Sequence, residues 1–231
     1  MQLVPMLSGL KDAGFSVRSD SRAATDELYE FDRSAVSAGC VLLGVDEAGR
    51  GPLAGPVVAA AVLLDSGVRI EGINDSKKVP VKRRERLFEE ITASALQWAT
   101  GRAQPEEIDR INILQATLVA MHRAVEKIAA PWNMLFIDGN QKIRTVSSDL
   151  QKTIIGGDAK SASIAAASII AKVTRDRLMM EYHDSFPHYG FDVHKGYGTR
   201  LHRDRIRKFG LSPIHRRSFC SNLVLQTVLD L

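Results

Sequence analysis

Two apolar runs on either side of a glycine- and proline-rich segment form the clearest hydrophobic pattern in the chain. The first run is Val41–Val45 and the second is Val57–Leu64, and the segment between them reads DEAGRGPLAGP. Apolar, β-branched runs around a cluster of turn residues predict two adjacent strands and their connection. The first run is followed at once by two acids, Asp46 and Glu47.

Further along the chain, helical and strand-like patterns alternate. Apolar positions recur at helical spacing in several segments, and short apolar runs bounded by turn residues lie between them. The predicted helices are 25–31, 80–95, 105–128, 159–186, a segment containing Leu201, Ile206 and Phe209, and 222–231. The further predicted strands are 97–102, 134–137 and 154–155. Residues 188–199 form a predicted polar, aromatic loop. This alternation predicts an α/β fold with a mixed central sheet and helices on both sides.

Acidic residues follow three of the predicted strands. Asp46 and Glu47 end the first, Asp138 ends the run 134–137, and Asp158 comes after 154–155 and two glycines. We expect these carboxylates to converge at the carboxyl ends of neighbouring strands. Four gathered negative charges repel one another unless cations lie among them, and oxygen-only ligands favour Mg²⁺ or Mn²⁺ over zinc. For Asp158 alone, a simple helix N-cap explains the residue equally well.

The segment after the first acids has the chemistry of a phosphate site. Gly49, Gly51 and Gly55 remove side chains that would hold a ligand away from the backbone, and Arg50 supplies a fork of donors. A carboxylate pair before a glycine is also common at ordinary turns, so the short motif has a substantial false-positive risk.

Composition adds a charge asymmetry to this picture. Residues 1–140 hold 16 Lys or Arg and 19 Asp or Glu, a net charge of −3, whereas residues 141–231 hold 15 and 8, a net charge of +7. Residues 195–217 alone contain eight basic residues and one acid. A basic C-terminal third favours a polyanionic partner, although a modestly basic soluble protein has the same charge.

Several blocks of the chain resemble the type 2 ribonuclease H family, ribonuclease HII. They include DEAGRGPLAGPVVAAAV, NDSKK, EEIDRINILQATLVAM, GGDAKSASIAAASIIAKVTRDR and HKGYGT, within residues 40–220. One mild departure is Val79, where the family normally has leucine after NDSKK. The resemblance implies a ribonuclease H-like sheet with a helical C-terminal portion. It also implies an endonuclease that hydrolyses the RNA strand of RNA–DNA hybrids, including 5′ of single ribonucleotides in duplex DNA.

The resemblance further implies the chemistry and the residues. Asp46, Glu47, Asp138 and Asp158 are the implied catalytic and metal-binding acids, with one or two Mn²⁺ or Mg²⁺ ions and products ending in 5′-phosphate and 3′-hydroxyl. Substrate-binding residues are implied at the GRG loop, at the NDSKK turn and in HKGYGT: Gly49, Arg50, Gly51, Ser76, Lys77, Lys195 and Tyr197. Main-chain groups of the GRG loop would reach the ribose 2′-hydroxyl, and Tyr197 would stack on a sugar. Ser76 and Lys77 would contact a backbone phosphate; without the resemblance, a solvated turn before a helix is the favoured interpretation.

The expected organisation is an N-terminal extension, residues 1–39 and partly flexible, followed by a catalytic domain over 40–231. A helical duplex-binding portion is expected from about 187 to 231. The apolar runs are too short to span a membrane, no secretory signal is evident, and Cys40 and Cys220 are expected to be reduced. We therefore expect a cytoplasmic protein, and we expect it to be a monomer. The resemblance implies roles in ribonucleotide and RNA-primer removal, with RNA–DNA hybrid and ribonucleotide-containing duplex as partners.

Two other functions fit parts of the pattern. A sugar kinase or phosphatase on a similar sheet would need an ATP-binding glycine motif, and G-x-x-x-x-G-K-[ST] is absent from the sequence. A non-catalytic nucleic-acid binder would not need four acids close to a phosphate, because without a metal they repel nucleic acid.

Overall fold

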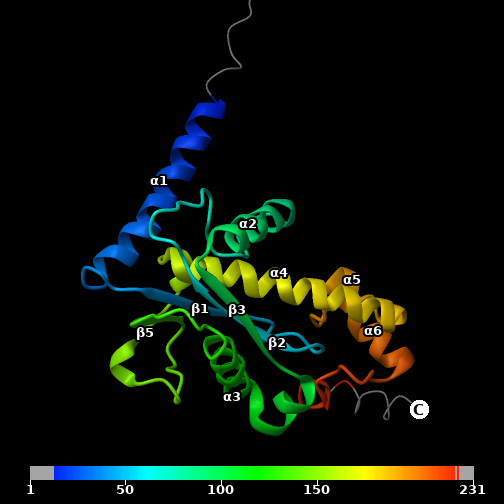
Figure 1. Cartoon of the computed structure of the whole chain (residues 1–231). Helices are drawn as coiled ribbons and strands as arrows, with labels where there is room; N and C mark the ends of the chain where they lie inside the picture. Colours follow the sequence, from blue (N-terminus) through cyan, green and yellow to red (C-terminus); the bar gives the residue numbers. More distant parts are fainter. Residues whose placement is uncertain (1–12, 222, 224–231) are drawn as a thin grey trace, which may run out of the picture.

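The computed structural model describes residues 13–221 and residue 223, which form a five-stranded mixed sheet between layers of helices (Figure 1). The strand order is β3-β2-β1-β4-β5. β2 is antiparallel to both β1 and β3, whereas β4 is parallel to β1 and β5 is parallel to β4. The strands are β1 (Leu42–Ala48), β2 (Val57–Leu63), β3 (Gln97–Ala103), β4 (Met134–Asp138) and β5 (Gln151–Ile154). The expected mixed α/β sheet is confirmed.

Both faces of the sheet are covered, which explains why β2 is apolar along its whole length. Ala59 and Ala61 pack in the cluster that includes α3, and Ala60 and Val62 pack against α2 and α4 on the opposite face (Figure 1). All seven residues of β2 are buried. The α-helices are α1 (Ala13–Ser34), α2 (Val81–Ser94), α3 (Pro105–Val125), α4 (Ala162–Ser185), α5 (Phe191–His194) and α6 (Arg200–Phe209).

Two glycines allow the large helices to approach the sheet at backbone distance. A Cβ atom on Gly44 of β1 would lie 2.2 Å from the carbonyl carbon of Ser163 in α4. One on Gly101 of β3 would lie 2.2 Å from the carbonyl oxygen of Ala120 in α3. Real Cβ atoms do not approach other atoms this closely, so a side chain at either position would separate helix from sheet.

Several predicted elements differ from those observed. Helix α1 is 22 residues long rather than a short helix at 25–31. Helix α3 is interrupted at Asn112, whose φ is +64° and whose Oδ1 accepts from the N–H groups of Leu114 and Gln115. The predicted loop 188–199 contains short helical turns, Pro187–Tyr189 and α5. The predicted final helix, 222–231, lies outside the described residues except for Leu223.

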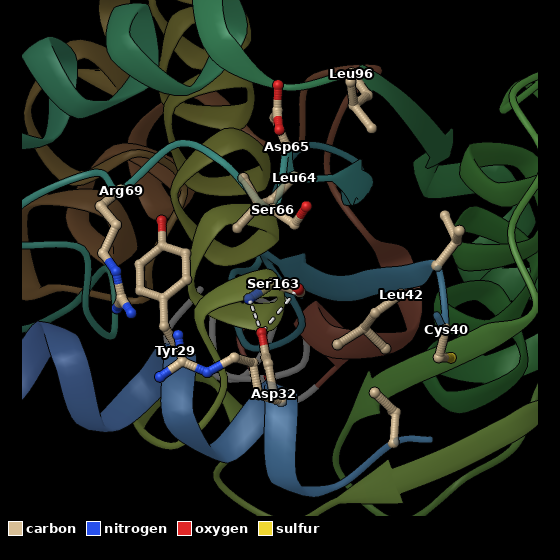
Figure 2. Close-up of a pocket in the computed structure, with 13 residues that line it drawn as sticks. Tyr29, Asp32, Cys40, Leu42, Leu64, Asp65, Ser66, Arg69, Leu96 and Ser163 are labelled. Atoms are coloured by element: carbon tan, nitrogen blue, oxygen red, sulfur yellow. Dashed lines mark hydrogen bonds between the residues drawn. The ribbon is translucent and has the colours of Figure 1, made fainter. Parts of the chain in front are cut away.

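Helix α1 packs against the sheet domain through apolar contacts and several hydrogen bonds. Leu28 is buried, and the hydroxyl of Tyr29 accepts a hydrogen bond from Ile70 N–H at 3.1 Å. Asp32 Oδ2 accepts from the N–H and hydroxyl of Ser163, at 2.9 and 2.8 Å, in the first turn of α4 (Figure 2). A cavity of about 210 Å³ lies beside these residues and reaches Leu42, at the opposite end of β1 from Asp46.

The described part of the chain, residues 13–221 and 223, has no helix with the length and hydrophobicity needed to span a bilayer. Cys40 and Cys220 are both free thiols.

Candidate active site

The pairing of β1 with β4 places two acids side by side. Val45 pairs with Ile137 in the parallel register, and Asp46 and Asp138 are the next residue on each strand. Neighbouring strands are about 4.8 Å apart, and side chains alternate between faces. Asp46 therefore shares the α4 face with Gly44, and the hydroxyl of Ser168 in α4 hydrogen-bonds to it. Asp138 is also directed to this face, because it lies two residues after the α4-facing Phe136.

The turn after β5 brings the fourth acid to the same place. Asp138 pairs with Ile154 at the end of β5, and Asp138 Oδ1 accepts a hydrogen bond from Gly157 N–H at 2.7 Å. Asp158 is the next residue and is the middle residue of a short helical turn, Gly157–Ala159, that precedes α4. The sheet topology thus gathers all four predicted acids at one end of β1, β4 and β5.

Burial and mutual repulsion make these carboxylates harder to ionise. Burial raises the pKa of Asp46 well above its ordinary value, and the charges of Glu47 and Asp138 raise it further. Burial also raises the pKa of Glu47, although Arg50 partly offsets this. The pKa of Asp158 is raised by burial and then by Asp75 and Asp138. This concentration of partly desolvated negative charge is the electrostatic condition that a bound cation relieves.

Two basic side chains lie among the acids. Arg50 is half exposed, with Nη1 3.6 Å from Glu47 Oε1. Lys77 Nζ lies 3.4 Å from Asp158 Oδ2 and 3.8 Å from Asp75 Oδ1. Burial lowers the pKa of Lys77, but the surrounding acids outweigh this and leave the pKa raised. Both cations can therefore contact a phosphate without leaving the neighbourhood of the acids.

The donor chemistry of the cluster fits a hard divalent ion. All four predicted ligands are carboxylates, which suit Mg²⁺ and Mn²⁺. Among the described residues, no three His, Cys, Asp or Glu side chains are arranged as a complete metal site. Two of the carboxyl oxygens accept main-chain hydrogen bonds instead: Asp46 Oδ1 from Glu47 N–H at 2.7 Å, and Asp138 Oδ1 from Gly157 N–H. A bound ion would thus use the remaining oxygens or require small side-chain rotations.

The three glycines of the loop between β1 and β2 differ in their surroundings. A Cβ on Gly49 would lie 2.0 Å from Arg175 Nε, and one on Gly55 would lie 2.4 Å from Met179 Sδ. Only at Gly51 is the direction of a Cβ open, with its nearest neighbour, the Tyr197 ring, 4.0 Å away. Gly49 and Gly55 are therefore required by internal packing, which differs from the expectation that all three make room for a ligand.

The loop containing Tyr197 lies directly beside this glycine loop. Leu53 N–H donates to the carbonyl of Gly196 at 2.8 Å, and Tyr197 is 43% exposed. Lys195 has a φ of +50°, and its ammonium is directed to the carbonyl of Asp192 and to Met180 Sδ. The Tyr197 ring therefore lies beside Gly51, whereas the Lys195 side chain is directed along the edge of α4.

Ser76 lies inside the protein rather than at its surface. Its side chain is 4% exposed, and its hydroxyl is 2.9 Å from the hydroxyl of Ser168, which also hydrogen-bonds to Asp46. The expected contact of the Ser76 hydroxyl with a phosphate does not match this placement, because the hydroxyl is used to hold Ser168. No sequence signal distinguished Ser168 from the other small residues of α4.

Two buried arginines, Arg175 and Arg216, were also missed. Both are 0% exposed, and both donate to main-chain carbonyls of the glycine loop. The sequence placed Arg216 in the basic stretch 195–217 that we expected to face a duplex, and its burial is a correction. The exposed basic residues of that stretch include Arg200, Arg203, Arg207, Lys208 and Arg217.

The chain matches a family model described as Ribonuclease HII over residues 43–222. It is 50% identical over 207 residues to a Ribonuclease HII of Endomicrobium trichonymphae, covering 88% of this chain and 98% of that relative. Among solved structures, it resembles the ribonuclease H2 of Pyrococcus horikoshii OT3, with a TM-score of 0.67 and 24% identity over 81% of this chain and 98% of that one. It also resembles Bst-RNase HIII in complex with Mn²⁺, with a TM-score of 0.65 and 18% identity over 90% and 73% of the two chains.

Proposed function

The chain belongs to the ribonuclease HII family, and we propose that it cuts duplex DNA on the 5′ side of a single embedded ribonucleotide. This activity would come in addition to the family's ribonuclease H endonuclease activity on RNA–DNA hybrids. The observation that supports the proposal is that each group of the site lies beside the next. The charge of Asp138 raises the pKa of Asp46, Glu47 and Asp158, and Arg50 Nη1 lies 3.6 Å from Glu47 Oε1. The exposed Tyr197 ring lies 4.0 Å from the Cβ position of Gly51.

The proposed division of roles follows from the chemistry of each group. Asp46, Glu47, Asp138 and Asp158 would hold one or two Mg²⁺ or Mn²⁺ ions. Such ions, when bound, activate water and stabilise the leaving oxygen of an in-line phosphodiester hydrolysis, which yields 5′-phosphate and 3′-hydroxyl ends. No protein side chain is needed as nucleophile. Ser168 would orient Asp46 through its hydroxyl.

The glycine loop between β1 and β2 and the loop containing Tyr197 would select the ribonucleotide. Only the 2′-hydroxyl distinguishes RNA from DNA at a given position. Main-chain groups of the loop Gly49-Arg50-Gly51 would contact it, and the open Cβ direction at Gly51 leaves room for the sugar. Tyr197 would stack on the neighbouring sugar. Lys77 and Arg50 would contact phosphates, and the main chain at Ser76 and the side chain of Lys195 remain proposed substrate contacts at the edge of the site.

The partners would be RNA–DNA hybrid and ribonucleotide-containing duplex, bound by a monomer in the cytoplasm through the exposed basic residues after 199. The cellular roles would be removal of misincorporated ribonucleotides and of RNA primers.

The decisive experiment incubates the protein with a labelled duplex containing one ribonucleotide, in Mg²⁺, in Mn²⁺ and in chelator. We expect a single cut 5′ of the ribonucleotide in either metal and none in chelator. Asp138→Asn should lose cleavage while retaining hybrid binding. Asp149→Asn is the matched control, because Asp149 is an exposed acid outside the cluster. Intact strands in every metal, with folded protein, would refute the proposal and favour a non-catalytic binder.

A further inference from the structure

Two positive charges are buried beneath the glycine loop without a carboxylate partner. Arg175 in α4 and Arg216 in the C-terminal segment are both fully buried, and in residues 13–221 and 223 neither forms a salt bridge or a hydrogen bond with an acid. A buried charge is expensive unless its hydrogen-bonding groups are satisfied. Here six main-chain carbonyls satisfy the two guanidinium groups, so the arginines act on backbone geometry.

Arg175 joins the two loops of the site. Its Nε and Nη2 donate to the carbonyls of Pro56 and Ala54 at 3.0 and 3.1 Å, and its Nη1 donates to the carbonyl of Lys195 at 3.0 Å. The loop backbone rests on the arginine stem, because a Cβ on Gly49 would lie 2.4 Å from Arg175 Cδ. One side chain therefore fixes the spacing between the glycine loop and the loop containing Tyr197.

Arg216 holds the part of the glycine loop closest to the acids. Its Nη2 donates to the carbonyl of Gly49 at 2.6 Å, its Nη1 to that of Arg50 at 2.8 Å, and its Nε to that of Gly55 at 2.9 Å. These three carbonyls thus point inward, toward the C-terminal segment. A guanidinium is suited to this, because its donors lie in one rigid plane.

The inward carbonyls determine where the neighbouring amide groups point. In a trans peptide, the C=O and the following N–H point in opposite directions. Since the carbonyls of Gly49 and Arg50 face Arg216, the N–H groups of Arg50 and Gly51 face away from it. Neither N–H donates to a protein acceptor among the hydrogen bonds of the described residues. Two consecutive donors are thus presented at the open side of the loop, next to Tyr197.

We propose that Arg175 and Arg216 are positioning residues for ribose selection: they turn the loop carbonyls inward so that the amides of Arg50 and Gly51 are presented to the 2′-hydroxyl and its adjacent phosphate. The inference rests on the proposed function. Burial lowers the pKa of Arg216 to about 9, so it remains charged at neutral pH and retains all its donors. The two charges also favour an anion at the loop surface without touching it.

The test compares Arg216→Lys and Arg175→Lys with Arg177→Lys. Lysine keeps a positive charge, but a single ammonium cannot reach three separated carbonyls. Arg177 is the matched control, because it lies on the same helix, is half exposed and pairs with Glu85 and Glu89 away from the loops. Affinity is measured in Ca²⁺ for a duplex with one ribonucleotide and for the same all-DNA duplex, over a range of salt concentrations.

For Arg216→Lys, we expect the preference for the ribonucleotide duplex to fall about tenfold, as for loss of one to two hydrogen bonds, with the salt slope unchanged. Arg175→Lys should behave similarly, and Arg177→Lys should match the wild type. An unchanged preference in both loop variants would overturn the proposal. Equal weakening for both duplexes would overturn it in favour of a contact that does not depend on the ribose, such as a direct phosphate contact.

A second measurement does not depend on the variants folding. Amide exchange of Arg50 and Gly51 in the wild type should be fast in the free protein and slowed only by the ribonucleotide duplex. Slow exchange in the free protein would show that these amides are already bonded and would overturn the proposal. If the wild type cuts the ribonucleotide duplex but Arg175→Lys and Arg216→Lys both select it as well as the wild type does, only this inference fails. If the wild type cuts nothing, the proposed function fails first.

Discussion

Gly44→Ala tests whether backbone contact between β1 and α4 holds the candidate site together. The added methyl group would lie 2.2 Å from the carbonyl carbon and 2.3 Å from the carbonyl oxygen of Ser163, and 2.7 Å from the amide nitrogen of Ile164. Ordinary Cβ contacts begin at about 3.4 Å, so α4 would have to move by about 1 Å. Backbone atoms cannot rotate away as a side chain would.

The expected cost follows from overpacking. Forcing extra volume into a closely packed interior costs about 1–3 kcal/mol, and this contact is with main-chain atoms, so we expect the upper part of that range. For a domain of this size, that corresponds to a fall of about 5–10 °C in Tm. The movement would also displace Ser168, which hydrogen-bonds to Asp46, so cleavage should fall together with stability.

Urea unfolding and thermal melting measure the effect, with Gly67→Ala as the matched control. Gly67 is exposed in a turn, does not have a positive φ, and its Cβ would meet only the Asp65 carboxylate at 3.3 Å. Alanine there should change the free energy of unfolding by less than about 0.5 kcal/mol. If Gly44→Ala and Gly67→Ala have the same stability, the argument from close helix–strand packing is refuted.

Three further perturbations have definite expected outcomes. Asp32→Ala removes the side chain that accepts two hydrogen bonds at the start of α4. It should lower the free energy of unfolding, measured in urea, by about 1–2 kcal/mol. The control Asp26→Ala breaks an exposed ion pair and should change this free energy by less than about 0.5 kcal/mol. Burial lowers the pKa of His202 to about 3 and that of His215 to about 4, so the unfolded chain binds more protons below pH 6.5. The histidine contribution to stability should be fully present above pH 6.5 and fall toward pH 4, by up to about 1.4 kcal/mol per pH unit per histidine. The raised pKa values of the site carboxyl groups act in the opposite direction, so the urea midpoints of the wild type and His202→Gln are compared at pH 7 and 5. The same change in midpoint in both proteins would contradict this. Mn²⁺ at about 100 times its Kd should raise the free energy of unfolding of the wild type by about 2.7 kcal/mol, measured by thermal melting, and chelator should reverse this. An equal increase in stability in Asp138→Asn would argue against a metal site at this acid.

Much of the fold was predictable because its determinants are local. The apolar runs of β1 and β2, the helical periodicity of α2 and α4 and the turn residues between them depend on neighbours a few positions away. The acids that end β1 and β4 were recognisable for the same reason, and the match to the ribonuclease HII family confirms the resemblance of the motif blocks. The break in α3 at Asn112 was missed, because an asparagine within a helical pattern does not by itself indicate a positive φ.

The roles of buried polar residues were decided only by the tertiary structure. Arg216 lies in a basic stretch that resembles a solvated surface, yet its three carbonyl partners are 161 to 167 residues away along the chain. Ser76 has the sequence context of an exposed turn, but its hydroxyl partner, Ser168, is 92 residues away. The chain alone therefore determined most of the strands and helices and the acids that end β1 and β4. Only packing decided which polar groups lose contact with water, because burial depends on distant residues that the local pattern does not contain.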